Sequence, residues 1–280
     1  MPLPINRIFI NYLVYGNEHI ESGINQLELI LNRMLSGVQR TWIIVDNSVT
    51  QPFTQQISTD RWMIPGNNSV WEFSGWDHGY QFIKTRFGIH FDNVILLAND
   101  TFHRRAYSLG GRSFLDDFNA DLVNERDLRK EVVGYLDDFP TEVSLMGIRY
   151  NSWIRSNIFM VPAEVAERLY PLVFPLQPDE IFSSNMHKFW SETDQISENW
   201  KAYISSWLFG SENLQYPEYR LHWLKAQSVT SDNWDFVKTK ARCILSEHYL
   251  TARLQHWGVP IINANKFEKK KDRHLLPYYE

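Results

Sequence analysis

Short apolar runs alternate with helical patterns over the first hundred residues. Nearly all-apolar runs of strand length occupy Arg7–Tyr15, Thr41–Val45 and Asn93–Ala98, and a shorter one lies at Trp62–Ile64. Between these runs, Gly23–Leu35 has apolar residues at three- and four-residue steps, which predicts a helix. Strands that are apolar on both faces are typical of a parallel sheet covered by helices on each side. The pattern therefore predicts an α/β fold with a mostly parallel, Rossmann-type sheet.

The second half of the chain has a less regular pattern. Residues 107–132 predict a loop followed by a helix, and Val143–Tyr150 and Ile158–Val161 predict two strands. Further helices are predicted over Pro162–Leu169, Ser197–Phe209 and Asp235–Trp257, the last of them ended by Gly258 and Pro260. No repeat or linker interrupts the chain, so we expect one compact unit.

Composition removes several classes of protein. Hydrophobic residues make up 44% of the 280 and charged residues 22%, which excludes a disordered chain. The net charge of −5 gives no electrostatic reason to bind nucleic acid. The lone Cys243 cannot form an internal disulfide and is predicted to be a core thiol. No run approaches the roughly 20 apolar residues of a membrane span, and no signal peptide is evident, so a cytosolic location is expected.

Polar residues follow two of the predicted strands at their carboxyl ends. Asp46 comes directly after Thr41–Val45, and Asn99 and Asp100 follow Asn93–Ala98. Ligands of open α/β sheets bind beyond the carboxyl ends of the strands, so these side chains lie where a site is expected. A carboxylate there can hold Mg²⁺ or Mn²⁺ against a diphosphate, although an Asn-Asp pair also makes an ordinary turn.

A glycine-containing segment lies between these two strands. Glu72–Gly79 is predicted to be a loop that leads into a helix over Asp77–Phe87. Gly75 and Gly79 would let a ligand approach the backbone closely, and Asp77 would accept a hydrogen bond from a nucleotide. Such a composition is equally that of an ordinary loop.

Taken in chain order, these motifs resemble the nucleotide-binding half of GT-A glycosyltransferases, and most closely the bacterial rhamnan-synthesis type of polysaccharide transferase. Gly75-Trp76-Asp77 and Asn99-Asp100-Thr101 resemble its Gly-x-Asp and Asn-Asp-Ser/Thr motifs. Ser156–Val161 and Glu247–Leu254 resemble its second-half strand and its late Glu-x-x-Leu-Thr helix. The resemblance runs from about Ile8 to Pro260. It implies a GT-A-like fold, with a nucleotide-sugar-binding half over residues 1–106 and an acceptor-binding half over residues 107–280.

The resemblance also implies roles for particular residues. Asp46, Gly75 and Asp77 would bind the nucleoside, and Asp100, with Asn99, would hold the diphosphate and a divalent metal. Asn99 stands where a two-carboxylate motif has its first Asp, and one carboxylate binds a divalent ion more weakly than two, so metal dependence stays open. Glu247 would be the general base of an inverting transfer.

The implied reaction moves a hexosyl group, with rhamnosyl as one candidate, from a nucleotide-diphosphate sugar to a hydroxyl of a polysaccharide or glycolipid in cell-surface glycan synthesis. Glu198 and the pair Asp179–Glu180 are rival bases. His103 and His248 are candidate metal or phosphate contacts, and Arg104–Arg105 would help to neutralise the diphosphate, although all four also suit ordinary surface or core positions. The basic stretch Lys266–Arg273 would suit peripheral contact with the inner face of the cell membrane, although its interspersed acids favour a solvated tail.

Two other functions fit the same pattern. One is a non-catalytic carbohydrate-binding or scaffold protein on a transferase-like fold. The other is a sugar nucleotidyltransferase, although the segment after the first strand lacks the expected Gly-rich, basic loop. Eleven Trp residues allow either a large aromatic core or rings that stack on a sugar or nucleotide.

Overall fold

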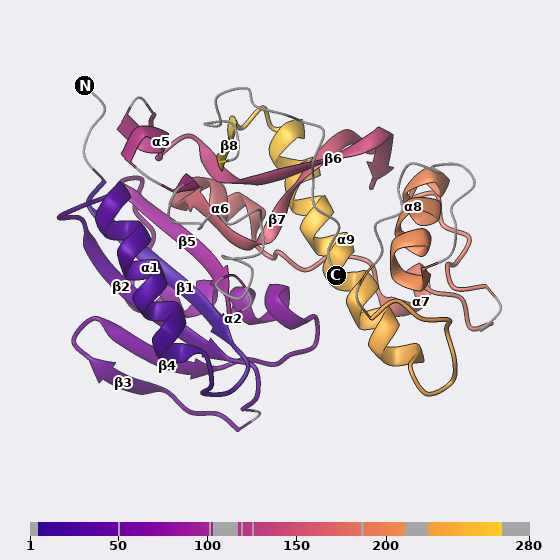
Figure 1. Ribbon diagram of the computed structural model, residues 1–280, viewed down its shortest axis with the longest axis horizontal. Helices are drawn as coiled ribbons and strands as arrows, with labels where there is room; N and C mark the ends of the chain where they lie inside the picture. The colour runs from indigo at the N-terminus through magenta and orange to yellow at the C-terminus, as the bar shows by residue number, and fades with distance from the viewer. Residues whose placement is uncertain are drawn as a thin grey trace.

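A single eight-stranded sheet organises the molecule, with strand order β3-β4-β2-β1-β5-β7-β6-β8 (Figure 1). This computed structural model describes residues 5–49, 51–100, 102, 117–118, 120–124, 126–185, 188–210, 223 and 225–264. Three segments named above, His103–Arg105, Thr101 and Lys266–Arg273, lie outside the described residues. Within the described ranges, no helix is long and apolar enough to cross a membrane.

The first half contributes the parallel part of the sheet. Strands β4 (Arg61–Pro65), β2 (Gln39–Asp46), β1 (Arg7–Val14) and β5 (Asn93–Asn99) lie side by side and run the same way. The edge strand β3 (Gln55–Ser58) pairs with β4 in the antiparallel sense. The sequence did not predict β3, because all four of its residues are exposed and give no apolar signal.

The second half extends the same sheet. Strand β7 (Ile148–Pro162) is antiparallel to β5, β6 (Val132–Leu145) is antiparallel to β7, and β8 (Ile261–Asn263) is parallel to β6. The predicted single strand Val143–Tyr150 is wrong, since a tight turn divides it. Met146 and Gly147 have φ values of +52° and +73°, which is typical of a two-residue hairpin turn.

Helices cover both faces of the sheet. Helix α1 (Ile20–Met34) and the short α5 (Ala120–Asn124) lie on one face, while α2 (Trp71–Phe87), α6 (Ala163–Leu169) and α9 (Trp234–His256) pack on the other. Helix α9 continues beyond the parallel strands to meet α8 (Glu198–Phe209), with α7 (Pro178–Ile181) nearby (Figure 1). The chain is therefore an α/β protein with a mostly parallel mixed sheet between helices, as the sequence predicts.

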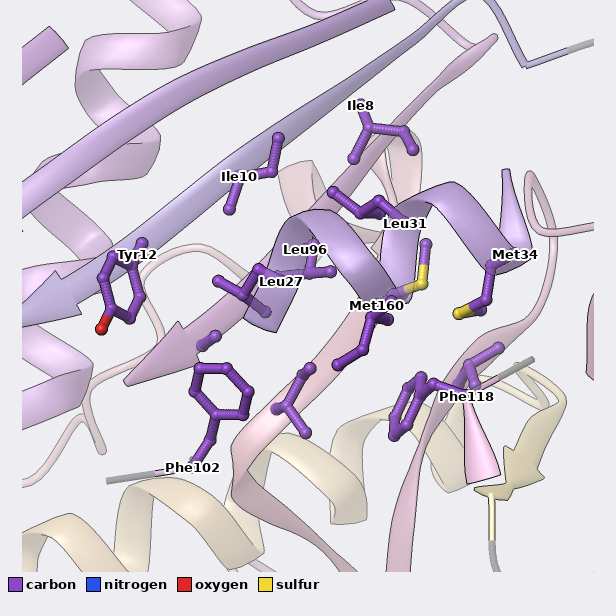
Figure 2. Packing of buried hydrophobic residues seen from close by; sticks show 14 of the residues in the cluster. Ile8, Ile10, Tyr12, Leu27, Leu31, Met34, Leu96, Phe102, Phe118 and Met160 are labelled. Atoms are coloured by element: carbon purple, nitrogen blue, oxygen red, sulfur yellow. The ribbon is translucent and has the colours of Figure 1, made fainter. Parts of the chain in front are cut away.

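Successive side chains of β1 point to opposite faces of the sheet, and both faces are covered by helices. Ile8, Ile10 and Tyr12 belong to the cluster beneath α1, which Figure 2 shows with Leu27 of that helix. The intervening Phe9 belongs to the cluster beneath α2. Each fully buried apolar side chain of this kind contributes about 1.5–3 kcal/mol relative to exposure. Asn11, a buried polar residue of β1, donates a hydrogen bond of 2.9 Å from Nδ2 to the carbonyl of Trp76.

Helix α2 begins six residues earlier than predicted. The segment Glu72–Gly79, expected to be a loop, is helical, and this prediction is wrong. Its glycines serve packing: a Cβ at Gly79 would lie 2.0 Å from Oδ1 of Asn11, and one at Gly75 would lie 2.0 Å from Cδ1 of Leu13. The glycines bring α2 close to β1 and do not form a ligand loop.

Candidate functional site

Asp46 ends β2 and organises the turn that follows β1. Its Oδ1 accepts hydrogen bonds from the backbone N–H of Gly16 (3.1 Å), the N–H of Ser48 (2.8 Å) and the hydroxyl of Ser48 (2.7 Å). The side chain is buried, and Gly16 has a φ of +80° that favours glycine. Asp46 thus fixes the backbone at the carboxyl edge of the sheet.

Asp100 lies on the other side of the same β1 turn. Its Oδ2 accepts a hydrogen bond of 3.1 Å from the backbone N–H of Tyr15. Asp46 and Asp100 therefore hold adjacent amides, those of Gly16 and Tyr15, from the two strands that flank β1. The ring of Tyr15 is 64% exposed at this edge. The structure confirms that the two acids share one edge of the sheet.

Ser156 of β7 connects this edge to helices α2 and α9. Its carbonyl accepts a hydrogen bond of 3.1 Å from Nδ2 of Asn99, next to Asp100. Its backbone N–H donates to Oε1 of Glu247, and its hydroxyl donates to Oε1 of Glu72 at 3.2 Å. One serine thus joins β5, α9 and the first turn of α2.

A bulge in β7 places Ser156 there. Gly134 of β6 pairs with Phe159, whereas Leu136 pairs with Ile154. Residues 155–158 of β7 therefore face a single residue of β6. Such bulges bend a strand and re-aim its side chains, here at the end of β5.

Burial of Glu247 raises the pKa of its carboxyl to about 7. The nearby charge of Lys240 and the hydrogen bonds from Ser156 lower that pKa, and the charge of Glu72 raises it slightly. A carboxyl with a pKa near 7 exchanges a proton readily at neutral pH, as a general base must. The neighbouring His248 is different: burial lowers its pKa to about 3, and its Nδ1 accepts a hydrogen bond from Nε1 of Trp200, so it stays neutral.

The rival bases lie in other surroundings. The side chain of Glu198 is 85% exposed and makes an ion pair with Lys201. Asp179 and Glu180 are exposed on α7, where Glu180 caps its own helix through a hydrogen bond from the N–H of Gln177. None of these three residues has a described contact with the sheet edge that carries Asp46 and Asp100. This favours Glu247 over them as the candidate base.

Asp77 is held away from the edge, in the middle of α2. Its carboxylate accepts hydrogen bonds from the N–H groups of Leu172 (2.7 Å) and Val173 (3.3 Å). Burial raises the pKa of Asp77 to about 6, against the lowering effect of these bonds and of Arg253. These contacts favour a structural role for Asp77 in fixing the segment after α6. Gly75 packs against Leu13 and against Asn47, the residue that follows Asp46.

The described residues at this edge offer few ligands for a metal ion. Among the residues that the structure describes, no group of three or more His, Cys, Asp or Glu side chains is placed to hold an ion. Asp100 offers one carboxylate, of which Oδ2 already accepts from Tyr15. Mg²⁺ often binds through one or two carboxylates and the phosphates of its substrate, so the edge suits an ion shared with a diphosphate.

Sequence reasoning missed Glu72 and Ser156 as members of the site. Both lie inside segments that the resemblance had singled out, Glu72–Gly79 and Ser156–Val161. Nothing in the local pattern marks a serine in a strand as a junction, because its partners are 57, 84 and 91 residues away. Only the bulge and the packing of α9 bring them together.

Comparison of the chain with models of protein families and with curated proteins finds no match to either.

Proposed function

We propose that this protein is a GT-A-type glycosyltransferase that moves a hexosyl group from a nucleotide-diphosphate sugar to a hydroxyl of a glycan or glycolipid. One observation carries the proposal. The carboxyl edge of the parallel strands holds Asp46 and Asp100, and Ser156 links that edge to a buried glutamate, Glu247, whose pKa is close to 7.

The donor would lie across the β1 turn. Asp46 is buried and accepts the N–H of Gly16, so its role toward the nucleoside is to fix the backbone turn on which the nucleoside would lie. The exposed ring of Tyr15 offers a flat apolar surface for a base. Asp100 would hold a Mg²⁺ or Mn²⁺ ion together with the diphosphate, and that ion would neutralise the leaving group.

Glu247 would act on the acceptor. Its carboxylate takes the proton of the acceptor hydroxyl as the acceptor oxygen bonds to the anomeric carbon. The bond from that carbon to the diphosphate oxygen breaks, and the nucleoside diphosphate leaves with the electron pair. A single displacement of this kind inverts the anomeric configuration. Product with the donor's configuration would refute the inverting mechanism.

Ser156 and Glu72 would position the base. The Ser156 N–H would fix the orientation of the Glu247 carboxylate. Glu72 orients the Ser156 hydroxyl from α2. Both residues act through Glu247 and need not touch the substrate.

A thermal-shift screen of nucleotides and nucleotide sugars, each with and without Mn²⁺, tests the proposal. A ligand at about 100 times its dissociation constant adds about 2.7 kcal/mol to the free energy of unfolding, which a melting curve resolves. Stabilisation by one nucleoside diphosphate identifies the base of the donor, and its loss in Asp100→Ala assigns the site. The absence of any shift would refute the transferase and favour the non-catalytic carbohydrate binder.

A further inference from the structure

Four aromatic side chains from four parts of the chain meet beside the start of α9. We call them the aromatic patch: Trp71 of α2, Trp207 of α8, Trp223, and Phe236 of α9. The rings of Trp207 and Trp223 are stacked with centroids 6.0 Å apart, Trp223 and Phe236 are stacked at 5.6 Å, and Trp71 lies 5.4 Å from Phe236. All four are partly or largely exposed, and Phe236 is 39% exposed.

Lysine ammonium groups are interleaved with these rings. Nζ of Lys240 lies 5.3 Å from the ring centroid of Trp71, 5.5 Å from that of Trp207 and 5.8 Å from that of Trp223. Nζ of Lys225 lies 5.9 Å from the ring of Phe236. The patch therefore combines apolar ring surface with hydrogen-bond donors, which a purely structural core does not need.

The patch continues directly into the candidate site. Phe236, Lys240 and Glu247 are four and seven residues apart on α9, so they share one face of the helix. At 1.5 Å per residue, Lys240 lies about 10 Å along the axis from Glu247. Trp71 is next in sequence to Glu72, which joins Glu247 through Ser156.

Trp71 is held in an uncommon backbone conformation. Its φ of +42° lies in the left-handed region, which a bulky side chain seldom adopts. The carbonyl of Trp71 accepts hydrogen bonds from Nδ2 of Asn47 (2.9 Å) and from the hydroxyl of Ser74 (3.1 Å), and these bonds fix the conformation. Strain of this kind persists where surrounding contacts over-determine it, and it concentrates at binding sites.

From these observations we infer that the aromatic patch binds a sugar ring of the acceptor glycan, away from the ring that carries the reacting hydroxyl. A pyranose has an apolar C–H face for an aromatic surface and hydroxyl oxygens for ammonium donors, which matches this combination of rings and lysines. Binding a remote ring would hold the acceptor hydroxyl at Glu247. The inference rests on the proposed transferase function for its link to Glu247, but not for carbohydrate binding itself.

The test compares two substitutions of Phe236 on an array of immobilised neutral and acidic oligosaccharides, with titration calorimetry of the strongest hit. Phe236→Leu keeps an apolar side chain but removes the ring, whereas Phe236→Tyr keeps the ring. We expect Phe236→Leu to weaken binding about tenfold and Phe236→Tyr to bind as the wild type does. Phe91→Leu is the matched control, since Phe91 is 57% exposed just before β5, at the opposite end of the strands.

Three results would overturn the inference: no oligosaccharide bound by the wild type, equal binding by Phe236→Leu, or selective capture of a peptide by the patch. The two proposals fail separately. If no nucleotide binds but glycan binding is lost in Phe236→Leu, the transferase function is refuted and glycan binding by the aromatic patch is supported. If transfer occurs and Phe236→Leu keeps the wild-type KM for the acceptor, glycan binding by the aromatic patch is refuted and the transferase function is supported.

Discussion

Two buried carboxyls on the α2–α9 side of the sheet have similar surroundings and different positions. Glu247 and Asp77 both have a raised pKa, to about 7 and about 6, because both are buried. Both accept hydrogen bonds from backbone N–H groups, and each has a cation nearby, Lys240 for Glu247 and Arg253 for Asp77. A raised pKa alone therefore does not separate a catalytic group from a structural one.

What separates them is the segment that each carboxyl holds. Glu247 binds Ser156, which contacts Asn99 next to Asp100 at the sheet edge. Asp77 binds the amides after α6, a segment that Arg253 also holds through the carbonyl of Leu169 at 2.7 Å. Glu247 is thus connected to the edge where a ligand is expected, and Asp77 to a fixed loop.

The largest expected effect is on turnover, from Glu247→Gln. The amide is isosteric but cannot take a proton, so we expect kcat to fall by roughly 10²- to 10⁴-fold with the donor found by thermal shift. Glu198→Gln is the matched control, because the side chain of Glu198 is 85% exposed and forms an ion pair with Lys201. Turnover of Glu247→Gln within threefold of the wild type would show that another group is the base.

For Asp77→Ala we expect a loss of stability with little change in turnover. The substitution leaves two buried N–H groups without their acceptor and removes a partner of Arg253, so the free energy of unfolding should fall by about 2–4 kcal/mol. Denaturant unfolding measures the loss, with the exposed Asp60→Ala as control. The kcat per folded molecule should stay within twofold of the wild-type value. A large drop in kcat would show that Asp77 belongs to the active site.

The pH dependence of stability should differ between wild type and Glu247→Gln. The folded protein binds the Glu247 proton more tightly than the unfolded chain, whose pKa is about 4.5, so the free energy of unfolding falls as pH rises from about 4.5 to 7. Glu247→Gln lacks this loss and should gain about 1–3 kcal/mol over the wild type between pH 5 and pH 8. Asp77 contributes its own fall in the free energy of unfolding as pH rises from about 3.8 to about 6, and it does so in both proteins. Parallel stability curves would show that Glu247 is not buried as described.

The smallest expected effect comes from Gly79→Ala, which tests the helix that carries both Glu72 and Asp77. Alanine favours a helix by about 1 kcal/mol, yet its Cβ would lie within 3 Å of three side-chain atoms of Asn11. We expect a net loss of about 1–2 kcal/mol in the free energy of unfolding. Combining Gly79→Ala with Asn11→Ala should recover part of it, and a stabilised Gly79→Ala would contradict the close packing of α2 on β1.

The parts of the fold that the sequence missed have identifiable reasons. The start of α2 was misplaced because Gly75 and Gly79 are typical loop residues, and only their distance from β1 explains them within a helix. The pattern of β6 mixes polar and apolar residues, because the strand is buried at its beginning and exposed around Pro140. Strand β8 has three residues and pairs only with β6, which is too short for a periodic signal.

The sequence alone determined the layered α/β fold and the position of Asp46 and Asp100, because strand-length apolar runs and the residues after them are local features. Two acids at the carboxyl ends of parallel strands in one sheet must reach the same edge of that sheet. Only the tertiary structure decided that Ser156 and Asn99 link Glu247 to that edge, that Asp77 holds the segment after α6, and that four distant aromatic residues meet beside α9. These placements depend on a strand bulge and on helix packing between residues far apart in the chain, such as Trp71 and Phe236, which no local pattern encodes.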